Sequence, residues 1–169
     1  MKILVFGAGA VGGYLGARLA SNGHDVTLVT RRPAAEAIER HGLTLVQDGK
    51  QTVTRPVVVP ALRQAFMNGA EYELILLTMK AYDAQAALYE LVAFCPTIPT
   101  VLTLQNGIGI EELYATEFGA GQVIAGSLTT PPAPTWGPPG AGATSDGIWG
   151  ITISPTTAIH RSTWRRMSG

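Results

Sequence analysis

The chain of 169 residues contains very little cysteine and no long apolar run. Its one cysteine, Cys95, excludes an intramolecular disulfide framework and leaves no second thiol for a paired zinc or redox site, so we expect no metal. Because apolar residues precede it at the end of a predicted helix, we expect Cys95 to be small, buried and inert. No run approaches the roughly 20 apolar residues that cross a bilayer, and we expect no membrane partner.

Charge is also scarce. Asp, Glu, Lys and Arg make up 14% of the chain, and twelve basic and twelve acidic side chains give a formal net charge of zero. A general polyanion binder would carry a basic stripe, so we expect no nucleic-acid partner. The apolar content of 46% excludes a disordered chain. At about 100–200 residues per domain, the length indicates a single domain.

The N-terminus imitates a secretory signal peptide, because Lys2 is followed by an apolar stretch and by small residues as far as Ala20. The glycines at positions 7, 9, 12, 13 and 16 fit a signal peptide poorly and satisfy a stricter pattern. We therefore expect a cytoplasmic protein.

Short apolar runs alternate with helical patterns over the first 126 residues. This alternation predicts an α/β fold, a Rossmann-like, doubly wound and mainly parallel sheet with helices on both faces. Ala84, Leu88 and Leu91 share one face of a predicted helix. The other predicted helices are Ala10–Asn22 and Glu111–Phe118. The predicted strands are Lys2–Phe6, Asp25–Val29, Leu43–Gln47, Thr52–Val59, Leu74–Met79, Thr100–Leu104 and Gln122–Gly126, with a hairpin turn at Asp48–Lys50.

The composition changes after Phe118, because glycine and proline become frequent and Asp146 is the only formal charge from Gly119 to Ile159. These residues exclude a long helix, and Ile148–Ile153 alternates as one more strand would. We expect residues 1–154 to form the dinucleotide-binding domain, and residues 155–169 to form a loose C-terminal tail.

A glycine-rich motif lies between the first predicted strand and helix. The sequence Gly7-Ala8-Gly9-Ala10-Val11-Gly12 fits G-x-G-x-x-G in the strand–turn–helix context that a dinucleotide site requires. Gly7 is expected to permit the tight turn, and Gly9 to let the backbone approach a pyrophosphate. The free amides at Ala10 and Val11 would bind that pyrophosphate, and Gly12 would let the helix pack closely. S-adenosylmethionine sites and simple packing are the alternative uses of such a turn.

The end of the second strand bears on the choice of cofactor. An NAD site usually has an acidic residue there, about 20 residues after the motif, to bind the ribose hydroxyls. This chain has Arg31 and Arg32 instead, and Asp25 lies at the opposite end of the strand. A guanidinium binds phosphate with two parallel hydrogen bonds, so Arg31 predicts NADP, and Arg32 is either a second contact or a solvated side chain.

Polar residues follow two later strands, at the sheet edge where ligands bind. Lys80 ends the apolar Leu74–Met79 run, and its ammonium could hold a phosphate or carboxylate. Asn106 follows the next strand and offers both a donor and an acceptor near the nicotinamide. Asp83 is expected only to cap the next helix, and Glu111 to interact only with a helix dipole. A solvated loop lysine and a simple Asn-Gly turn are the alternatives for Lys80 and Asn106.

In combination these motifs resemble the ketopantoate reductase (2-dehydropantoate 2-reductase) family over about residues 1–130. They are the glycine motif with Gly13 and Tyr14, Arg31, Lys80-Ala81-Tyr82-Asp83 and Gln105-Asn106-Gly107. The resemblance implies an N-terminal NADP-binding Rossmann domain followed by a helical domain. It implies that NADPH reduces 2-dehydropantoate to pantoate, in the route to pantothenate and coenzyme A. It makes Gly7, Gly9 and Gly12 pyrophosphate contacts, makes Arg31 the 2′-phosphate contact, and places Lys80 and Asn106 in the catalytic cleft.

The chain also departs from the family. The family's proton-donating lysine belongs to the helical domain, whereas this chain has lysines only at 2, 50 and 80, and we expect that domain to be absent. The segment Ala133–Gly147 lacks the family's usual pattern. We therefore expect binding of NADPH, a 2-oxo acid as substrate, and weak or no turnover by the chain alone. The alternatives are a non-catalytic NADP-binding module, a truncated product that self-associates or needs a partner chain, and a related dehydrogenase with another substrate.

Overall fold

A computed structural model describes residues 1–47, 50–105, 107, 109–128, 133–134, 142–144 and 151–155. Four features predicted from the sequence lie wholly or mainly outside these residues. They are the turn residues Asp48 and Gly49, the candidate site residue Asn106, most of the segment Ala133–Gly147, and the tail, of which only Pro155 is described.

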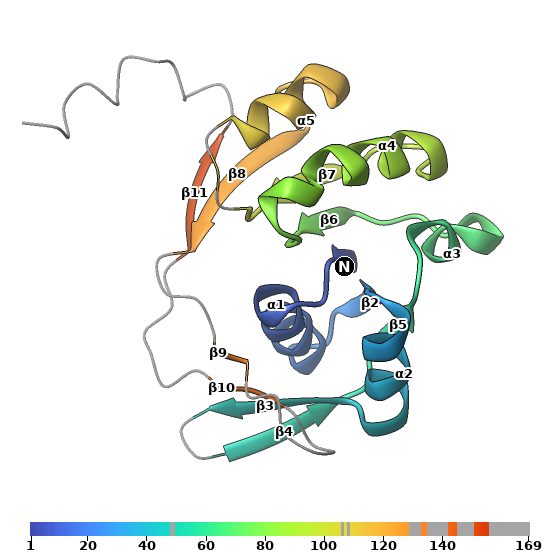
Figure 1. Ribbon diagram of the computed structural model, residues 1–169, viewed down its shortest axis with the longest axis vertical. Coiled ribbons are helices and arrows are strands. Elements are labelled where there is room, and N and C mark those ends of the chain that lie inside the picture. Colours follow the sequence, from blue (N-terminus) through green and yellow to red (C-terminus); the bar gives the residue numbers. More distant parts are fainter. Residues whose placement is uncertain are drawn as a thin grey trace, which may run out of the picture.

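The described chain alternates strands and helices in the predicted way (Figure 1). The strands are β1 Lys2–Phe6, β2 Asp25–Val29, β3 Leu43–Gln47, β4 Lys50–Thr54, β5 Val57–Val59, β6 Leu74–Leu77, β7 Thr100–Thr103, β8 Val123–Leu128, β9 Ala133–Pro134, β10 Gly142–Thr144 and β11 Ile151–Pro155. The helices are α1 Ala10–Ser21, α2 Arg32–His41, α3 Leu62–Ala65, α4 Ala84–Phe94 and α5 Ile110–Phe118, with short 3-10 turns η1 Met67–Gly69 and η2 Ala81–Asp83.

Seven strands form the main sheet in the order β11-β8-β7-β6-β1-β2-β5. All neighbours pair in parallel except β11, which runs antiparallel to β8. The chain first builds outward from β1 through β2 to β5, and then returns to the other side of β1 with β6, β7 and β8. This is the Rossmann-like, doubly wound arrangement, so the predicted fold class is confirmed.

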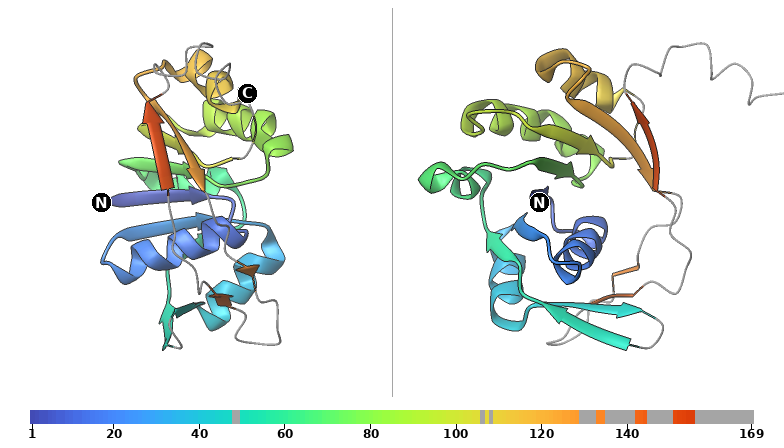
Figure 2. Two further views of the ribbon diagram at one scale, coloured as in Figure 1. Left: turned by 90° about the vertical axis from the view of Figure 1, so that its left-hand side faces the viewer. Right: turned by 180° about the vertical axis from the view of Figure 1, so that it is seen from behind.

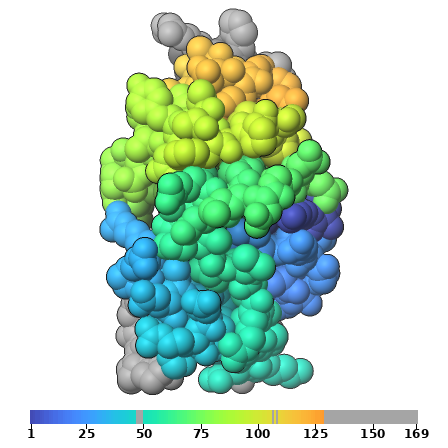
Figure 3. All heavy atoms as spheres, turned by 90° about the vertical axis from the view of Figure 1, so that its right-hand side faces the viewer, coloured from blue at the N-terminus to red at the C-terminus, as the bar shows by residue number. Residues whose placement is uncertain are grey.

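The two faces of the main sheet carry separate cores because strand side chains alternate. In β1, Ile3 and Val5 pack on the face that α1 covers, whereas Leu4 packs on the face that α3, α4 and α5 cover. The helical stripe predicted from Ala84, Leu88 and Leu91 faces this second core, with each side chain at most 6% exposed. Figure 3 views the side with β5, where α2, α3 and α4 follow one another from bottom to top in the order of the chain.

Helix α1 lies between two sheets. A second sheet, in the order β4-β3-β10-β9, lies beyond α1 from the main sheet, as Figures 1 and 2 show. Tyr14 and Ala17 of α1 pack against Leu45 of β3, while Gly16 faces Leu28 of the main sheet. Burial on both sides explains why this helix consists of small and apolar residues apart from Arg18 and Ser21 near its end.

The predicted single strand Thr52–Val59 is wrong. Residues Lys50–Thr54 form β4, which pairs antiparallel with β3, whereas Val57–Val59 form β5, which pairs in parallel with β2. Pro56 explains the division, because proline has no N–H to donate to a continuous ladder. The hairpin itself is confirmed by the pairing of Gln47 with Lys50. Helices α2 and α3 were not predicted, and the other predicted boundaries are right to within about three residues.

Candidate functional site

The strand order reverses between β1 and β6, and the chain leaves these neighbouring strands toward opposite faces of the sheet. Helix α1 follows β1 on one face, whereas α4 follows β6 on the other. Such a switch point opens a crevice at the carboxyl ends of the strands, where ligands of doubly wound sheets bind. The loops after β2, β1, β6 and β7 line this edge side by side, in the order of their strands.

The residues Gly7–Gly12, which we call the glycine turn, connect β1 to α1 at this crevice. Gly7 has a φ of 103°, a conformation that glycine adopts at little cost, and a Cβ there would lie 2.7 Å from the Met79 nitrogen. The Gly7 N–H donates to the Val29 carbonyl at 2.9 Å, which ties the turn to the end of β2. The positive φ and the lack of room for a Cβ explain why the tight turn predicted at this position requires glycine.

The next two glycines of the motif differ in what surrounds them. A Cβ on Gly12 would collide with the Gly7 carbonyl oxygen and lie 2.5 Å from Thr78 Oγ1, so the start of α1 packs without room for a side chain. A Cβ on Gly9 would meet no atom within 4 Å. Gly9 therefore faces open space, which is where the predicted contact with a pyrophosphate requires it to face.

The first turn of α1 has the features of an anion site. The N–H of Gly13 donates to the Gly9 carbonyl at 2.8 Å, so the amides of Ala10, Val11 and Gly12 precede the first helical hydrogen bond. No acidic side chain occupies this turn, and Gly9 at the N-cap has no side chain to cap it. These amides and the positive end of the helix dipole would stabilise a bound phosphate.

Thr78 is a residue of this site that the sequence prediction missed, because it was counted within an apolar strand. Strand β6 ends at Leu77, and the Thr78 hydroxyl donates toward the Gly7 carbonyl at 2.7 Å and the Phe6 carbonyl at 3.1 Å. A polar residue at the end of an otherwise apolar run was the available signal. Thr78 joins the ends of β1 and β6 at the switch point.

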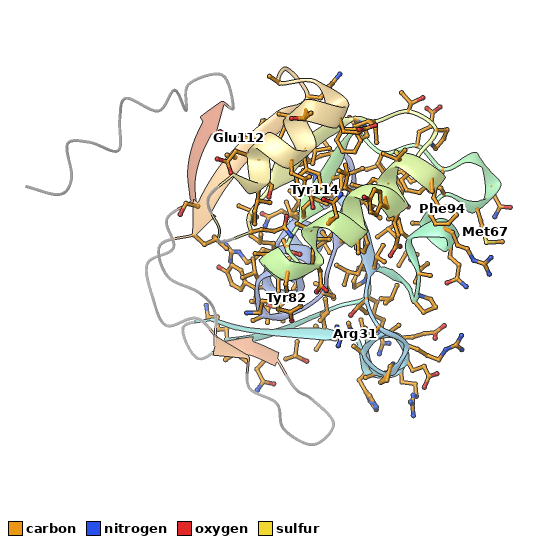
Figure 4. All side chains as sticks on the ribbon, turned by 45° about the horizontal axis from the view of Figure 1, so that its top comes forward. Arg31, Met67, Tyr82, Phe94, Glu112 and Tyr114 are labelled. Carbon is orange, nitrogen blue, oxygen red and sulfur yellow. The ribbon has the colours of Figure 1, made fainter. Side chains whose placement is uncertain are left out.

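Arg31 lies two residues after β2, beside the glycine turn. It occupies the N-cap position of α2, and its backbone carbonyl accepts hydrogen bonds from the N–H groups of Ala34 and Ala35. Its side chain is exposed and makes no ion pair with any described residue (Figure 4). Arg32 begins α2 and is also exposed, while Asp25 begins β2 at the opposite edge of the sheet.

Lys80 lies in the segment Thr78–Asp83, which we call the lysine loop. The Lys80 side chain is exposed, whereas its backbone carbonyl accepts hydrogen bonds from Gln105 Nε2 at 3.3 Å and from the Asp83 N–H at 2.9 Å. Asp83 occupies the N-cap position of α4, but its side chain makes no capping hydrogen bond, so the predicted cap is wrong. The 3-10 turn η2 that precedes α4 holds Asp83 in a helical conformation, unlike the extended conformation of a typical N-cap.

Gln105 links the lysine loop to the end of β7. Its side chain is 8% exposed, and its Oε1 accepts a hydrogen bond from the Thr103 hydroxyl at 3.3 Å. Tyr114 of α5 lies close by and is fully buried, and its hydroxyl donates to the Ala84 carbonyl at 3.1 Å. Burial raises the pKa of Tyr114, and the nearby side chain of Gln105 partly opposes this effect. The polar groups behind the lysine loop therefore form a buried network.

The candidate residues of the glycine turn, together with Arg31 and Lys80, gather at one edge of the sheet, whereas Asn106 lies outside the described residues. Cys95 is buried as expected, and burial raises the pKa of its thiol. Among the residues that the structure describes, no group of His, Cys, Asp and Glu could hold a metal. Within the same residues, every helix is too short or too polar to cross a membrane.

The comparisons with known proteins agree with this geometry. The family described as "Ketopantoate reductase PanE/ApbA" matches residues 3–133. The 2-dehydropantoate 2-reductase of Mesorhizobium japonicum is 38% identical over 109 residues, which are 64% of this chain and 32% of that protein. The crystal structure of 2-dehydropantoate 2-reductase from Geobacter metallireducens GS-15 superposes with a TM-score of 0.77 and 30% identity, covering 98% of this chain and 52% of that chain.

A structural neighbour with another name is nearly as similar. The ternary structure of D-mandelate dehydrogenase with NADH and anilino(oxo)acetate has a TM-score of 0.76 and 25% identity, covering 92% of this chain and 48% of that chain. The chain thus spans between about a third and a half of the proteins that it matches.

Proposed function

Because the chain belongs to the ketopantoate reductase family, we propose that it is the NADP-binding part of an oxidoreductase that reduces 2-dehydropantoate to pantoate. The observation that carries the proposal is the glycine turn at the switch point, with open space beside Gly9 and free amides at the start of α1. The exposed Arg31, which follows the neighbouring strand β2, supports NADPH over NADH, because its guanidinium can bind the 2′-phosphate.

The order of the strands gives the cofactor a direction. Arg31 follows β2, the glycine turn follows β1, and Lys80 follows β6. Neighbouring strands lie about 4.8 Å apart, so an extended dinucleotide would have its adenosine near Arg31, its pyrophosphate on the turn and its nicotinamide near the lysine loop. We therefore assign Lys80 and Asn106 to the nicotinamide and substrate end.

The cofactor would supply the hydride, and the residues of this chain would bind and orient it. The ammonium of Lys80 can attract the carboxylate of a 2-oxo acid, and it can also donate a proton to the alkoxide that hydride transfer creates. We propose that these 169 residues bind NADPH by themselves but turn over substrate slowly or not at all. The fraction of the relatives' length that they span supports this.

Fluorescence titration of the purified chain with NADPH and NADH tests the cofactor assignment. Arg31→Ala should weaken NADPH binding by about 1.5–3 kcal/mol, or roughly ten- to hundredfold, and leave NADH binding nearly unchanged. Arg63→Ala is the matched control, because Arg63 is an exposed arginine of α3 on the other face of the sheet. Equal losses for both cofactors would contradict a 2′-phosphate contact, and no binding of NADPH to the wild type would overturn the proposed function.

The likeness to D-mandelate dehydrogenase favours a second candidate, an NADH-dependent reductase of a different 2-oxo acid. Tighter binding of NADH than of NADPH would support it. Oxidation of NADPH that depends on 2-dehydropantoate, and not on an aryl 2-oxo acid, would support the first candidate. Tight NADPH binding without any turnover is the result expected of a cofactor-binding part that is inactive by itself.

A further inference from the structure

The Thr78 hydroxyl lies within hydrogen-bond distance of two carbonyl oxygens on the neighbouring chain segment. Its oxygen lies 2.7 Å from the Gly7 carbonyl oxygen and 3.1 Å from that of Phe6, and one hydroxyl proton serves both acceptors. The Thr78 N–H also donates to the Phe6 carbonyl at 3.0 Å. The end of β6 therefore holds the end of β1 and the first residue of the glycine turn together.

The glycine turn is consequently held from both sides. On the β2 side, the N–H groups of Gly7 and Ala8 share the Val29 carbonyl at 2.9 and 3.3 Å. On the β6 side, the Thr78 hydroxyl draws the Gly7 carbonyl oxygen toward β6. Gly12 packs directly over this contact, because a Cβ on Gly12 would lie 2.5 Å from Thr78 Oγ1.

The orientation of the Gly7 carbonyl matters for an anion. The Gly7 carbonyl oxygen lies between Thr78 and Gly12. If this peptide rotated so that the oxygen approached the amides of Ala10 and Val11, it would present partial negative charge beside them. Gly7, with a φ of 103°, could adopt other backbone conformations, because glycine is less restricted than other residues. The hydroxyl of Thr78 satisfies this oxygen on the β6 side and keeps the amide side of the turn positive.

We propose that Thr78 is a positioning residue of the anion site, which holds the glycine turn in its phosphate-binding conformation through the hydrogen bond to the Gly7 carbonyl. The proposal rests on the proposed function, because it takes the pyrophosphate of NADPH as the anion. Thr78 itself does not touch the cofactor. Its role is to set the direction of a backbone dipole at the switch point.

The test compares Thr78→Val, which removes the hydroxyl but keeps the shape, with Thr78→Ser, which keeps the hydroxyl. Thr78→Val should weaken NADPH binding roughly three- to tenfold, as expected for one net hydrogen bond, and Thr78→Ser should restore most of it. Binding of 2′-AMP should not change in either variant, because 2′-AMP has no 5′-phosphate to contact the turn. Equal weakening in both variants, or none in Thr78→Val, would overturn the proposal. If Thr78→Val does not fold, Thr78→Ala replaces it in the same comparison.

Amide hydrogen exchange of the ligand-free protein separates this proposal from the proposed function. Thr78→Val should speed exchange at Gly7 and Ala8 at least several-fold more than at Leu91 in α4, and Thr78→Ser should not. Equal acceleration at all three amides would indicate global destabilisation and contradict a positioning role. A wild-type protein that does not bind NADPH would refute the proposed function, whereas the exchange result would still decide whether Thr78 orders the turn.

Discussion

The two ends of the candidate site differ in the groups that they offer to a ligand, which are backbone amides in the glycine turn and a side chain in the lysine loop. In the glycine turn, Gly7 and Gly12 have no room for a side chain, and the groups available to an anion are backbone amides. In the lysine loop, the side chain of Lys80 is exposed, and the loop is held from behind by the buried amide of Gln105. One end is therefore specified by the absence of side chains, whereas the other end depends on particular side chains.

The two ends should therefore tolerate different substitutions. A turn made of closely packed backbone cannot accept an added atom, so its sensitivity is steric and large. The lysine loop is anchored through the carbonyl of Lys80. Its stability should therefore depend little on the Lys80 side chain, but it should depend on Gln105, which donates a hydrogen bond to that carbonyl. Four substitutions test this contrast.

Gly12→Ala should have the largest effect. The new Cβ would collide with the Gly7 carbonyl oxygen and approach Thr78 Oγ1, and overpacking of this kind typically costs about 1–3 kcal/mol. We expect the free energy of unfolding in urea to fall by about 2–3 kcal/mol, with loss of NADPH binding. Gly13→Ala is the matched control, because a Cβ there meets no atom within 4 Å, and a helical alanine should add up to about 1 kcal/mol. Equal free energies of unfolding for Gly12→Ala and Gly13→Ala would contradict the steric argument.

Gln105→Leu should come next. The substitution removes the acceptor of the buried Thr103 hydroxyl, and an unsatisfied buried polar group costs about 1–3 kcal/mol. It also removes one of the two donors to the Lys80 carbonyl, which keeps its hydrogen bond from the Asp83 N–H. We expect a loss of about 2 kcal/mol in urea unfolding. Gln85→Leu, on the exposed face of α4, should change stability by less than about 0.5 kcal/mol. A harmless Gln105→Leu would show that the loop is not anchored by this amide.

Tyr114→Phe should remove a pH dependence. Burial raises the pKa of Tyr114 above the 10.0 of an unfolded tyrosine, so its contribution to stability is fully present below pH 10 and is lost as the pH rises. The wild type should lose up to about 1.4 kcal/mol per pH unit above pH 10 from this group, and Tyr114→Phe should lack that part of the slope. Urea unfolding of both proteins between pH 8 and pH 11 measures the difference. If the free energies of unfolding of the wild type and of Tyr114→Phe fell equally with pH, the raised pKa of Tyr114 would be contradicted.

Lys80→Ala should have the smallest effect on stability. The exposed side chain makes no hydrogen bond or ion pair with described residues, and the carbonyl that anchors the loop is retained. We expect the free energy of unfolding to change by less than about 0.5 kcal/mol. If Lys80→Ala lost as much stability as Gln105→Leu, the Lys80 side chain would be structural. The contrast between Gln105, which anchors the loop, and Lys80, which is available to a ligand, would then not hold.

Much of the fold was predictable because its signals are local. The β1–glycine turn–α1 unit is encoded by consecutive residues, and the alternation of apolar runs and helical patterns predicted a mainly parallel sheet. The prediction failed at Thr52–Val59, where a uniform β-type composition concealed two strands of different sheets on either side of Pro56. It also failed at Asp83, because the preceding 3-10 turn determines the geometry of that helix start.

Local sequence signals were enough to locate the glycine turn, the arginine after the second strand and the lysine after the apolar strand. Only the tertiary structure showed that Thr78 holds Gly7, 71 residues earlier in the chain, and that Gln105 holds the carbonyl of Lys80. The physical reason is the range of the interactions. Turn conformation and helix initiation depend on neighbouring residues, whereas a side chain can select a distant carbonyl only after the sheet has placed β1, β6 and β7 side by side.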